Sequence, residues 1–90
     1  MKIIGKTESG QLVVGDIFKF FDTHGLPLAD MFSMCIASDL QPCWIDFYNQ
    51  AIEHGWKHKT ILLRLADALT DSYGAEYAKI VIERLELKYN

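Results

Sequence analysis

Three glycines, Gly25, Gly55 and Gly74, divide most of this chain into stretches that are too short for a long helix. Each glycine follows a segment in which large apolar residues recur at the helical period, and glycine readily takes the left-handed conformation that ends a helix. His24 and His54 precede two of them, and the negative end of a helix dipole favours histidine there. The spacing therefore predicts several short helices that pack against one another.

Residues 2–14 instead predict a β-hairpin. Residues 3–7 and 11–14 are rich in side chains that favour strands, and they flank a short turn in which Gly10 can take a positive φ. An isolated hairpin is marginal in water, so its apolar face is expected to pack on the rest of the molecule. Ninety residues allow one domain. We therefore expect a mainly α fold over 1–90: a compact bundle of four to five short helices (16–89) with an N-terminal β-hairpin.

An aspartate and two prolines mark expected helix starts. Asp16 is expected to cap the first helix, Pro27 to start the second (about 27–38) and Pro42 to start the third. A fourth helix is expected over about 57–73, and a fifth after it. The inward stripe of the third helix is predicted to contain Trp44, Ile45, Tyr48, Ala51 and Ile52. Phe47 lies off this stripe, so it is expected to be available to a partner.

Charge is unevenly distributed along the chain. No Lys or Arg occurs between Lys19 and Lys57, and residues 57–64 then carry cations without an acid, in a chain of net charge −3. The field of a charged patch selects what approaches it, so this polarity bears on partners. The cation-free stretch carries five acids: Asp22, Asp30, Asp39, Asp46 and Glu53.

Four of these acids, with two apolar anchors, are the candidate partner-binding residues. Half of the chain is hydrophobic, which is more than so small an interior is expected to hold, so an apolar patch should be exposed as at an interface. We expect a protein partner, such as a basic nucleic-acid-binding protein, or a homodimer; an ordinary solvated surface is the alternative. The candidates are Asp30, Asp39, Asp46, Glu53, Phe47 and Leu63.

The basic segment is a candidate anion-binding site, made of Lys57, Lys59, Arg64 and Trp56. Cations at a helix start oppose the helix dipole, so either neighbouring negative groups offset them or they bind an anion such as phosphate. Trp56 is then available to stack on a base. Three cations are few for nucleic acid, so direct nucleic-acid or phosphate binding is the alternative function.

No pattern in the chain predicts catalysis. It contains no glycine-rich phosphate loop after a strand, no G-x-S-x-G and no H-E-x-x-H, so we expect no catalytic residue and no cofactor. No metal is expected either, because the C-x7-C-x10-H-x3-H spacing of Cys35, Cys43, His54 and His58 departs from that of zinc sites. Free thiols and a cytoplasmic location are expected, with no membrane span and no signal peptide.

Two short stretches resemble known families. Residues 16–28 (DIFKFFDTHGLPL) are similar to the L-F-K-L-Y-D-T-Y-G-F-P-L stretch of alanyl-tRNA synthetases, which is helical and lies outside their catalytic motifs. The helix–Gly–x–Pro–helix pattern accounts for that likeness, and it carries over no functional residue. Residues 2–13 (KIIGKTESGQLV) resemble the start of small phage and prophage accessory proteins.

Together with the small size and the acidity of the chain, this second stretch makes the chain similar to phage-encoded inhibitors of host defence, including anti-CRISPR proteins. That resemblance implies a role in occupying surfaces of host macromolecules, and it implies no particular site residue. The sequence therefore predicts a non-enzymatic protein-interaction module, acting as a stoichiometric inhibitor or adaptor.

Overall fold

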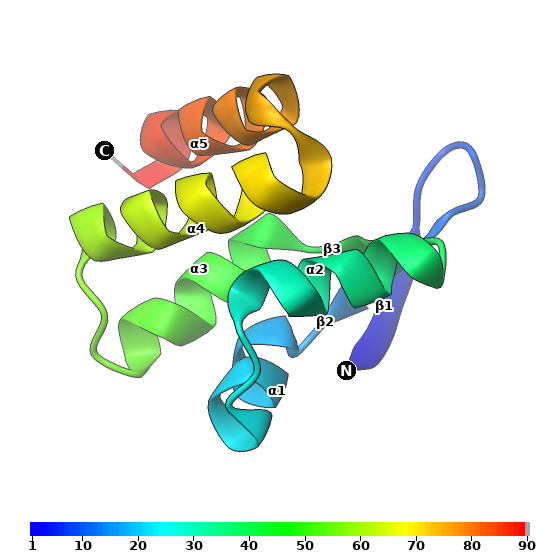
Figure 1. Cartoon of the computed structure of the whole chain (residues 1–90), viewed down its shortest axis with the longest axis horizontal. Coiled ribbons are helices and arrows are strands. Elements are labelled where there is room, and N and C mark those ends of the chain that lie inside the picture. The colour runs from blue at the N-terminus through cyan, green and yellow to red at the C-terminus, as the bar shows by residue number, and fades with distance from the viewer. Residues whose placement is uncertain (90) are drawn as a thin grey trace.

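A computed structural model describes residues 1–89 and confirms the mainly α fold with an N-terminal hairpin (Figure 1). α4 and α5 lie side by side as an antiparallel pair, α2 packs against α4, and α1 packs against α3 (Figure 1). No helix within residues 1–89 combines the length and apolar character needed to cross a bilayer. In chain order the elements are β1 (Lys2–Lys6), β2 (Leu12–Gly15), α1 (Ile17–His24), α2 (Leu28–Ala37), β3 (Leu40–Pro42), α3 (Trp44–Glu53), α4 (His58–Tyr73) and α5 (Ala75–Tyr89).

One hydrophobic core joins all five helices to β2. Phe32 of α2 and Phe47 of α3 are fully buried at its centre, with their rings 6.3 Å apart. Phe18 of α1 packs edge-on against Phe47 at 5.4 Å. Aromatic side chains bury large areas and favour such tilted pairs, so these rings hold three helices together.

The prediction that Pro42 starts the third helix is wrong. Pro42 lies in β3, which pairs in parallel with β2, and α3 begins at Trp44. Proline has no N–H to donate, but β3 is an edge strand in the order β1-β2-β3, where a donor can be missing at little cost. The next residue, Cys43, donates its N–H to the carbonyl of Val14 at 2.9 Å and continues the pairing.

Asp16 occupies the N-cap position of α1 as predicted, but its side chain does not cap the helix. A capping side chain requires an extended backbone, whereas Asp16 has φ 59° and its carboxylate makes no capping bond. Instead, the backbone N–H of Asp16 donates to Asp46 Oδ2 at 2.8 Å, and Gln50 Nε2 donates to Asp16 Oδ1 at 2.8 Å. The hydrogen bond from Gln50 holds the pKa of Asp16 below its usual value. These bonds fasten the start of α1 to α3.

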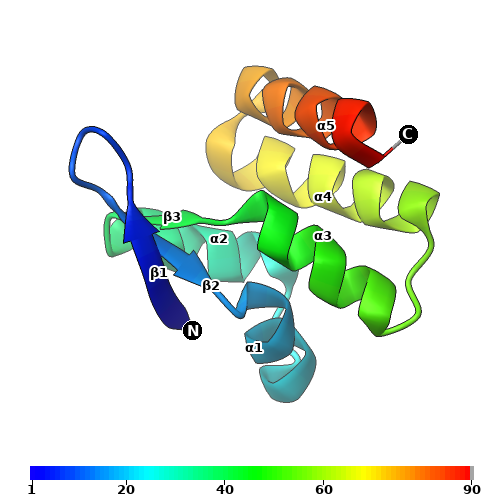
Figure 2. The ribbon, with the colours of Figure 1, turned by 180° about the vertical axis from the view of Figure 1, so that it is seen from behind.

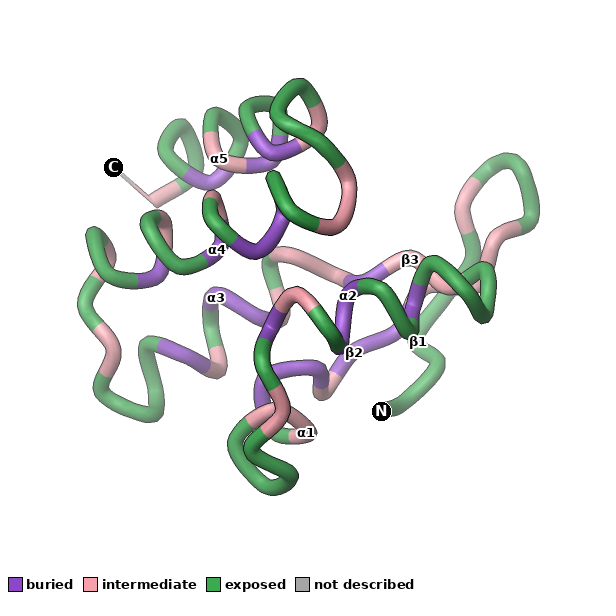
Figure 3. The backbone as a smooth tube through the Cα atoms, in the orientation of Figure 1, coloured by how far each residue is buried: buried purple, intermediate pink, exposed green. Residues whose placement is uncertain are grey.

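β1 is exposed along its whole length (Figure 3). It pairs with β2 along one edge, and the backbone irregularity between Ile3 and Gly5 shifts its register. Ile3 and Ile4 are 60% and 48% exposed, whereas Val14 and Gly15 of β2 are buried. β2 is therefore the strand that attaches the hairpin to the core, while β1 lies outside the core (Figure 2).

Two stacked tyrosines, Tyr73 and Tyr77, differ in how their hydroxyl groups are satisfied. Their ring centroids are 4.5 Å apart. The Tyr77 hydroxyl accepts hydrogen bonds from Gln41 Nε2 at 2.8 Å and from Trp44 Nε1 at 3.1 Å. The Tyr73 hydroxyl is buried and has no hydrogen-bond partner among residues 1–89, and burial raises the pKa of Tyr73 well above the usual tyrosine value.

Tyr73→Phe is therefore expected to leave the free energy of unfolding unchanged or to raise it by up to about 1 kcal/mol, because it removes an unsatisfied buried hydroxyl. Tyr77→Phe is expected to lower it by about 1–2 kcal/mol, because two donors lose their acceptor. Urea denaturation of both variants measures the difference. An equal loss of stability in the two variants would show that the Tyr73 hydroxyl is satisfied in solution.

Candidate functional site

The register of α3 places two isoleucines on the surface. Phe47, Tyr48 and Ala51 are buried, whereas Ile45 and Ile52, seven residues apart on the outer face, are 44% and 42% exposed. Phe47 completes the buried stripe because it packs between the rings of α1 and α2. The prediction of Phe47 as an exposed anchor is therefore wrong, as is the inward placement of the two isoleucines.

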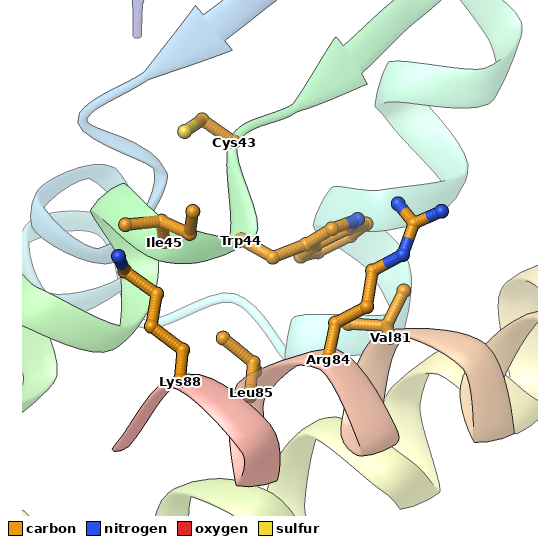
Figure 4. Close-up of a pocket in the computed structure, with 7 residues that line it drawn as sticks. All are labelled: Cys43, Trp44, Ile45, Val81, Arg84, Leu85 and Lys88. Atoms are coloured by element: carbon orange, nitrogen blue, oxygen red, sulfur yellow. The ribbon is translucent and has the colours of Figure 1, made fainter.

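A groove lies between the start of α3 and the second half of α5, and it contains a cavity of about 160 Å³ (Figure 4). α5 packs mainly against α4, so the space between α5 and α3 is incompletely filled. We call this surface the α3–α5 groove. It is lined by Cys43, Trp44, Ile45, Val81, Arg84, Leu85 and Lys88.

The inner wall of the groove is apolar and well packed. Val81 and Leu85 are buried core residues. The indole of Trp44 is held by its bond to the Tyr77 hydroxyl and packs edge-on against Phe32 at 5.1 Å. An engineered protein cavity of about 150 Å³ accommodates benzene, so this cavity is large enough for one apolar side chain.

Two cations border this apolar wall. Arg84 and Lys88 rise from α5 on the two sides of Leu85 and extend toward the start of α3 (Figure 4). Neither forms an ion pair with a carboxylate of residues 1–89. The groove therefore combines a preformed apolar cavity with unneutralised positive charge.

A second, more open hollow lies between the later part of α3 and the end of α5. It is lined by Tyr48, Asn49, Ile52, Glu53 and Tyr89. Tyr89 stacks on Tyr48 with ring centroids 3.9 Å apart, and its hydroxyl donates to Asn49 Oδ1 at 2.9 Å. Burial raises the pKa of Tyr89 above the usual value. This stacked pair joins α5 to α3 beside the exposed Ile52.

The structure does not bring the four predicted acids into one docking face. Asp39 accepts a hydrogen bond from Gln11 Nε2 at 3.3 Å, just before β2 begins, whereas Asp46 is bonded to Asp16 just after β2 ends. The two aspartates are therefore bonded to residues at opposite ends of β2. The other two are exposed in different helices, Asp30 in the first turn of α2 and Glu53 at the end of α3.

Leu63, the second predicted anchor, is exposed at 69%, but it does not line the α3–α5 groove. With Leu62, Ala66, Ile82 and two charged residues it lines a separate shallow hollow between α4 and α5. That hollow is broad and open, and its charges are of both signs. We therefore treat the α3–α5 groove as the stronger candidate site.

The residues of the predicted basic segment lie in two different environments. The Arg64 guanidinium lies 4.5 Å from the Trp56 ring centroid and 5.5 Å from that of Phe21. A base stacked on that face of Trp56 would have to displace Arg64. Lys57 and Lys59 are exposed at the start of α4, and Lys59 points to the α4–α5 hollow. The four residues thus do not form one flat binding surface.

The cysteines and histidines lie apart. Both cysteines are free thiols: Cys35 is buried, which raises its pKa, and Cys43 is half-buried at the groove. His54 Nε2 lies 3.4 Å from Asp22 Oδ1, and His58 Nδ1 lies 2.7 Å from the Tyr48 hydroxyl. In the part of the chain that the structure describes, no three such side chains are grouped to hold a metal ion.

No family model, curated protein or solved structure matches this chain. The site is therefore defined by its geometry. Sequence reasoning missed Arg84 and Lys88, the cations of the groove. Their spacing of four residues beside the buried positions Val81 and Leu85 was the available signal, since it places both at the border of the inward face of α5.

Proposed function

We propose that this protein is a non-enzymatic interaction module that binds one partner protein through the α3–α5 groove, as a stoichiometric inhibitor or adaptor. The observation that carries the proposal is a preformed apolar cavity with Trp44 and Ile45 in its wall and two cations at its border. Central apolar pockets surrounded by polar groups are typical of the energetic centre of a protein interface.

The exposed apolar surface supports the same function. Ile45 and Ile52 are accessible on the outer face of α3, although the core beneath them is already filled by Phe47 and Ala51. Exposed apolar side chains commonly mark an interaction surface where they adjoin an apolar groove, and Ile45 lines the α3–α5 groove. The partner is expected to place one apolar side chain in the cavity and to cover these isoleucines.

The test uses Ile45→Glu and a matched control, Ile36→Glu. Ile45 and Ile36 are 44% and 45% exposed, but Ile36 is on α2 and outside the groove. Tagged wild-type protein is used to capture partners from a nuclease-treated extract of the cells that encode it, and the captured protein is then titrated by calorimetry. A one-to-one complex is expected, with Ile45→Glu weakening it at least about 30-fold, as for a residue at the centre of an interface.

The control separates binding from folding, because both substitutions place the same charge at equally exposed positions. Ile36→Glu is expected to bind like the wild type. Failure to capture any protein, equal weakening by the two variants, or turnover of the captured protein as a substrate would contradict the proposed function.

A further inference from the structure

We propose that the partner segment bound in the α3–α5 groove is acidic: one apolar side chain enters the cavity, and carboxylates beside it meet Arg84 and Lys88. This inference rests on the proposed function and adds the chemistry of the partner. It reverses the expectation, drawn from the run of acids in the sequence, that the partner is basic.

The two cations are placed to act together. Arg84 and Lys88 are four residues apart on α5, so they leave the helix on the same face, about 6 Å apart along its axis. Figure 4 shows their side chains on either side of Leu85, with the cavity between them and the start of α3. An apolar group in the cavity therefore lies between two positive charges.

The acids on neighbouring elements do not neutralise these cations. No acidic residue lines the cavity. On α3, the Asp46 carboxylate accepts the backbone N–H of Asp16. On α5, Glu83 lies 4.0 Å from Lys79, and Glu86 lines the hollow on the α4 side. The positive charge at the groove is thus available to a partner.

Charge complementarity selects a protein segment over the other candidates. A basic segment would place like charges opposite Arg84 and Lys88, which opposes binding. A nucleic acid usually engages a larger basic surface than two side chains. A short acidic segment with one apolar residue fits both the size and the charge of this site.

The test is selection of a displayed library of random linear peptides on the immobilised protein. Enriched peptides are expected to carry Phe, Leu or Ile with Asp or Glu within one helical turn of it. Arg84→Glu/Lys88→Glu is expected to weaken the best peptide at least about tenfold, because it places like charges across the interface. The matched control, Lys57→Glu/Lys59→Glu, changes the net charge equally at exposed positions outside the groove and is expected to bind normally.

The outcomes separate this inference from the proposed function. If Ile45→Glu abolishes peptide binding but the Arg84/Lys88 reversal does not, the groove binds proteins without selecting acids and the inference is wrong. If no peptide depends on Ile45, the proposed function is wrong as well. Tight binding of fluorescein-labelled single-stranded DNA or RNA, lost on the Arg84/Lys88 reversal, would assign the cations to phosphate and overturn the acidic protein segment.

Discussion

Replacing Phe47 with alanine is expected to lower the free energy of unfolding by about 3–5 kcal/mol, the usual cost of truncating a fully buried aromatic side chain. The ring of Phe47 has no exposed surface and touches Phe18 of α1 and Phe32 of α2. Its removal leaves a cavity where three helices meet. Urea or thermal denaturation measures the loss.

Leu63→Ala provides the comparison, because Leu63 and Phe47 were predicted together as apolar anchors for a partner. Leu63 is 69% exposed, so its truncation is expected to change stability by no more than about 0.5 kcal/mol. Similar losses of stability in the two variants would contradict the described register of α3.

Gly15→Val is expected to lower the free energy of unfolding by about 2–5 kcal/mol, through overpacking and a lost hydrogen bond. A Cβ atom at Gly15 would lie 3.2 Å from Asp46 Oδ2 and 3.2 Å from Ile4 Cδ1. The exposed side chain of Ile4 can move away, but displacing Asp46 breaks its bond to the backbone of Asp16. The substitution therefore loosens the junction of β2, α1 and α3.

Gly5→Val is the control for β propensity, since Gly5 also lies in a strand and a Cβ there meets nothing within 4 Å. Its stability in urea is expected to match the wild type or to exceed it slightly, because valine favours extended backbone. If both variants lost stability equally, contact with Asp46 would not be the cause of the Gly15 effect.

The helix ends could be predicted from the sequence because they depend on local backbone preference. Gly25, Gly55 and Gly74 all have positive φ at or just after a helix end, and Gly10 has positive φ in the hairpin turn. These conformations are available to glycine whatever the surrounding fold. The ends of α1, α3 and α4 follow from them, whereas the end of α2 is not marked by a glycine.

The register of α3 could not be predicted in the same way. Trp44, Tyr48 and Ala51 belong to two overlapping helical stripes, one completed by Ile45 and Ile52 and the other by Phe47. Periodicity alone does not choose between them. The choice is made by the rings of α1 and α2, which form a site for Phe47, and it leaves both isoleucines at the surface.

The candidate site was missed for a related reason. Charge along the sequence drew attention to the acids of residues 20–56 and to the cations of 57–64, but the fold distributes those groups over several surfaces. Arg84 and Lys88 belong to a candidate site only because the start of α3 lies opposite them and forms a groove with α5. The start of α3 is more than thirty positions away from them in the chain, so no local sequence pattern indicates that the two segments are neighbours.

The parallel pairing of β2 with β3 couples the unfolding of the hairpin to that of α1 and α2. α1 and α2 lie in the chain between these two strands, so the ladder closes a loop that contains both helices. Three paired positions cannot offset the entropy of closing that loop unless the helices already hold its ends together. Opening either helix is therefore expected to release β3 and to loosen the hairpin, so that these distant segments unfold together.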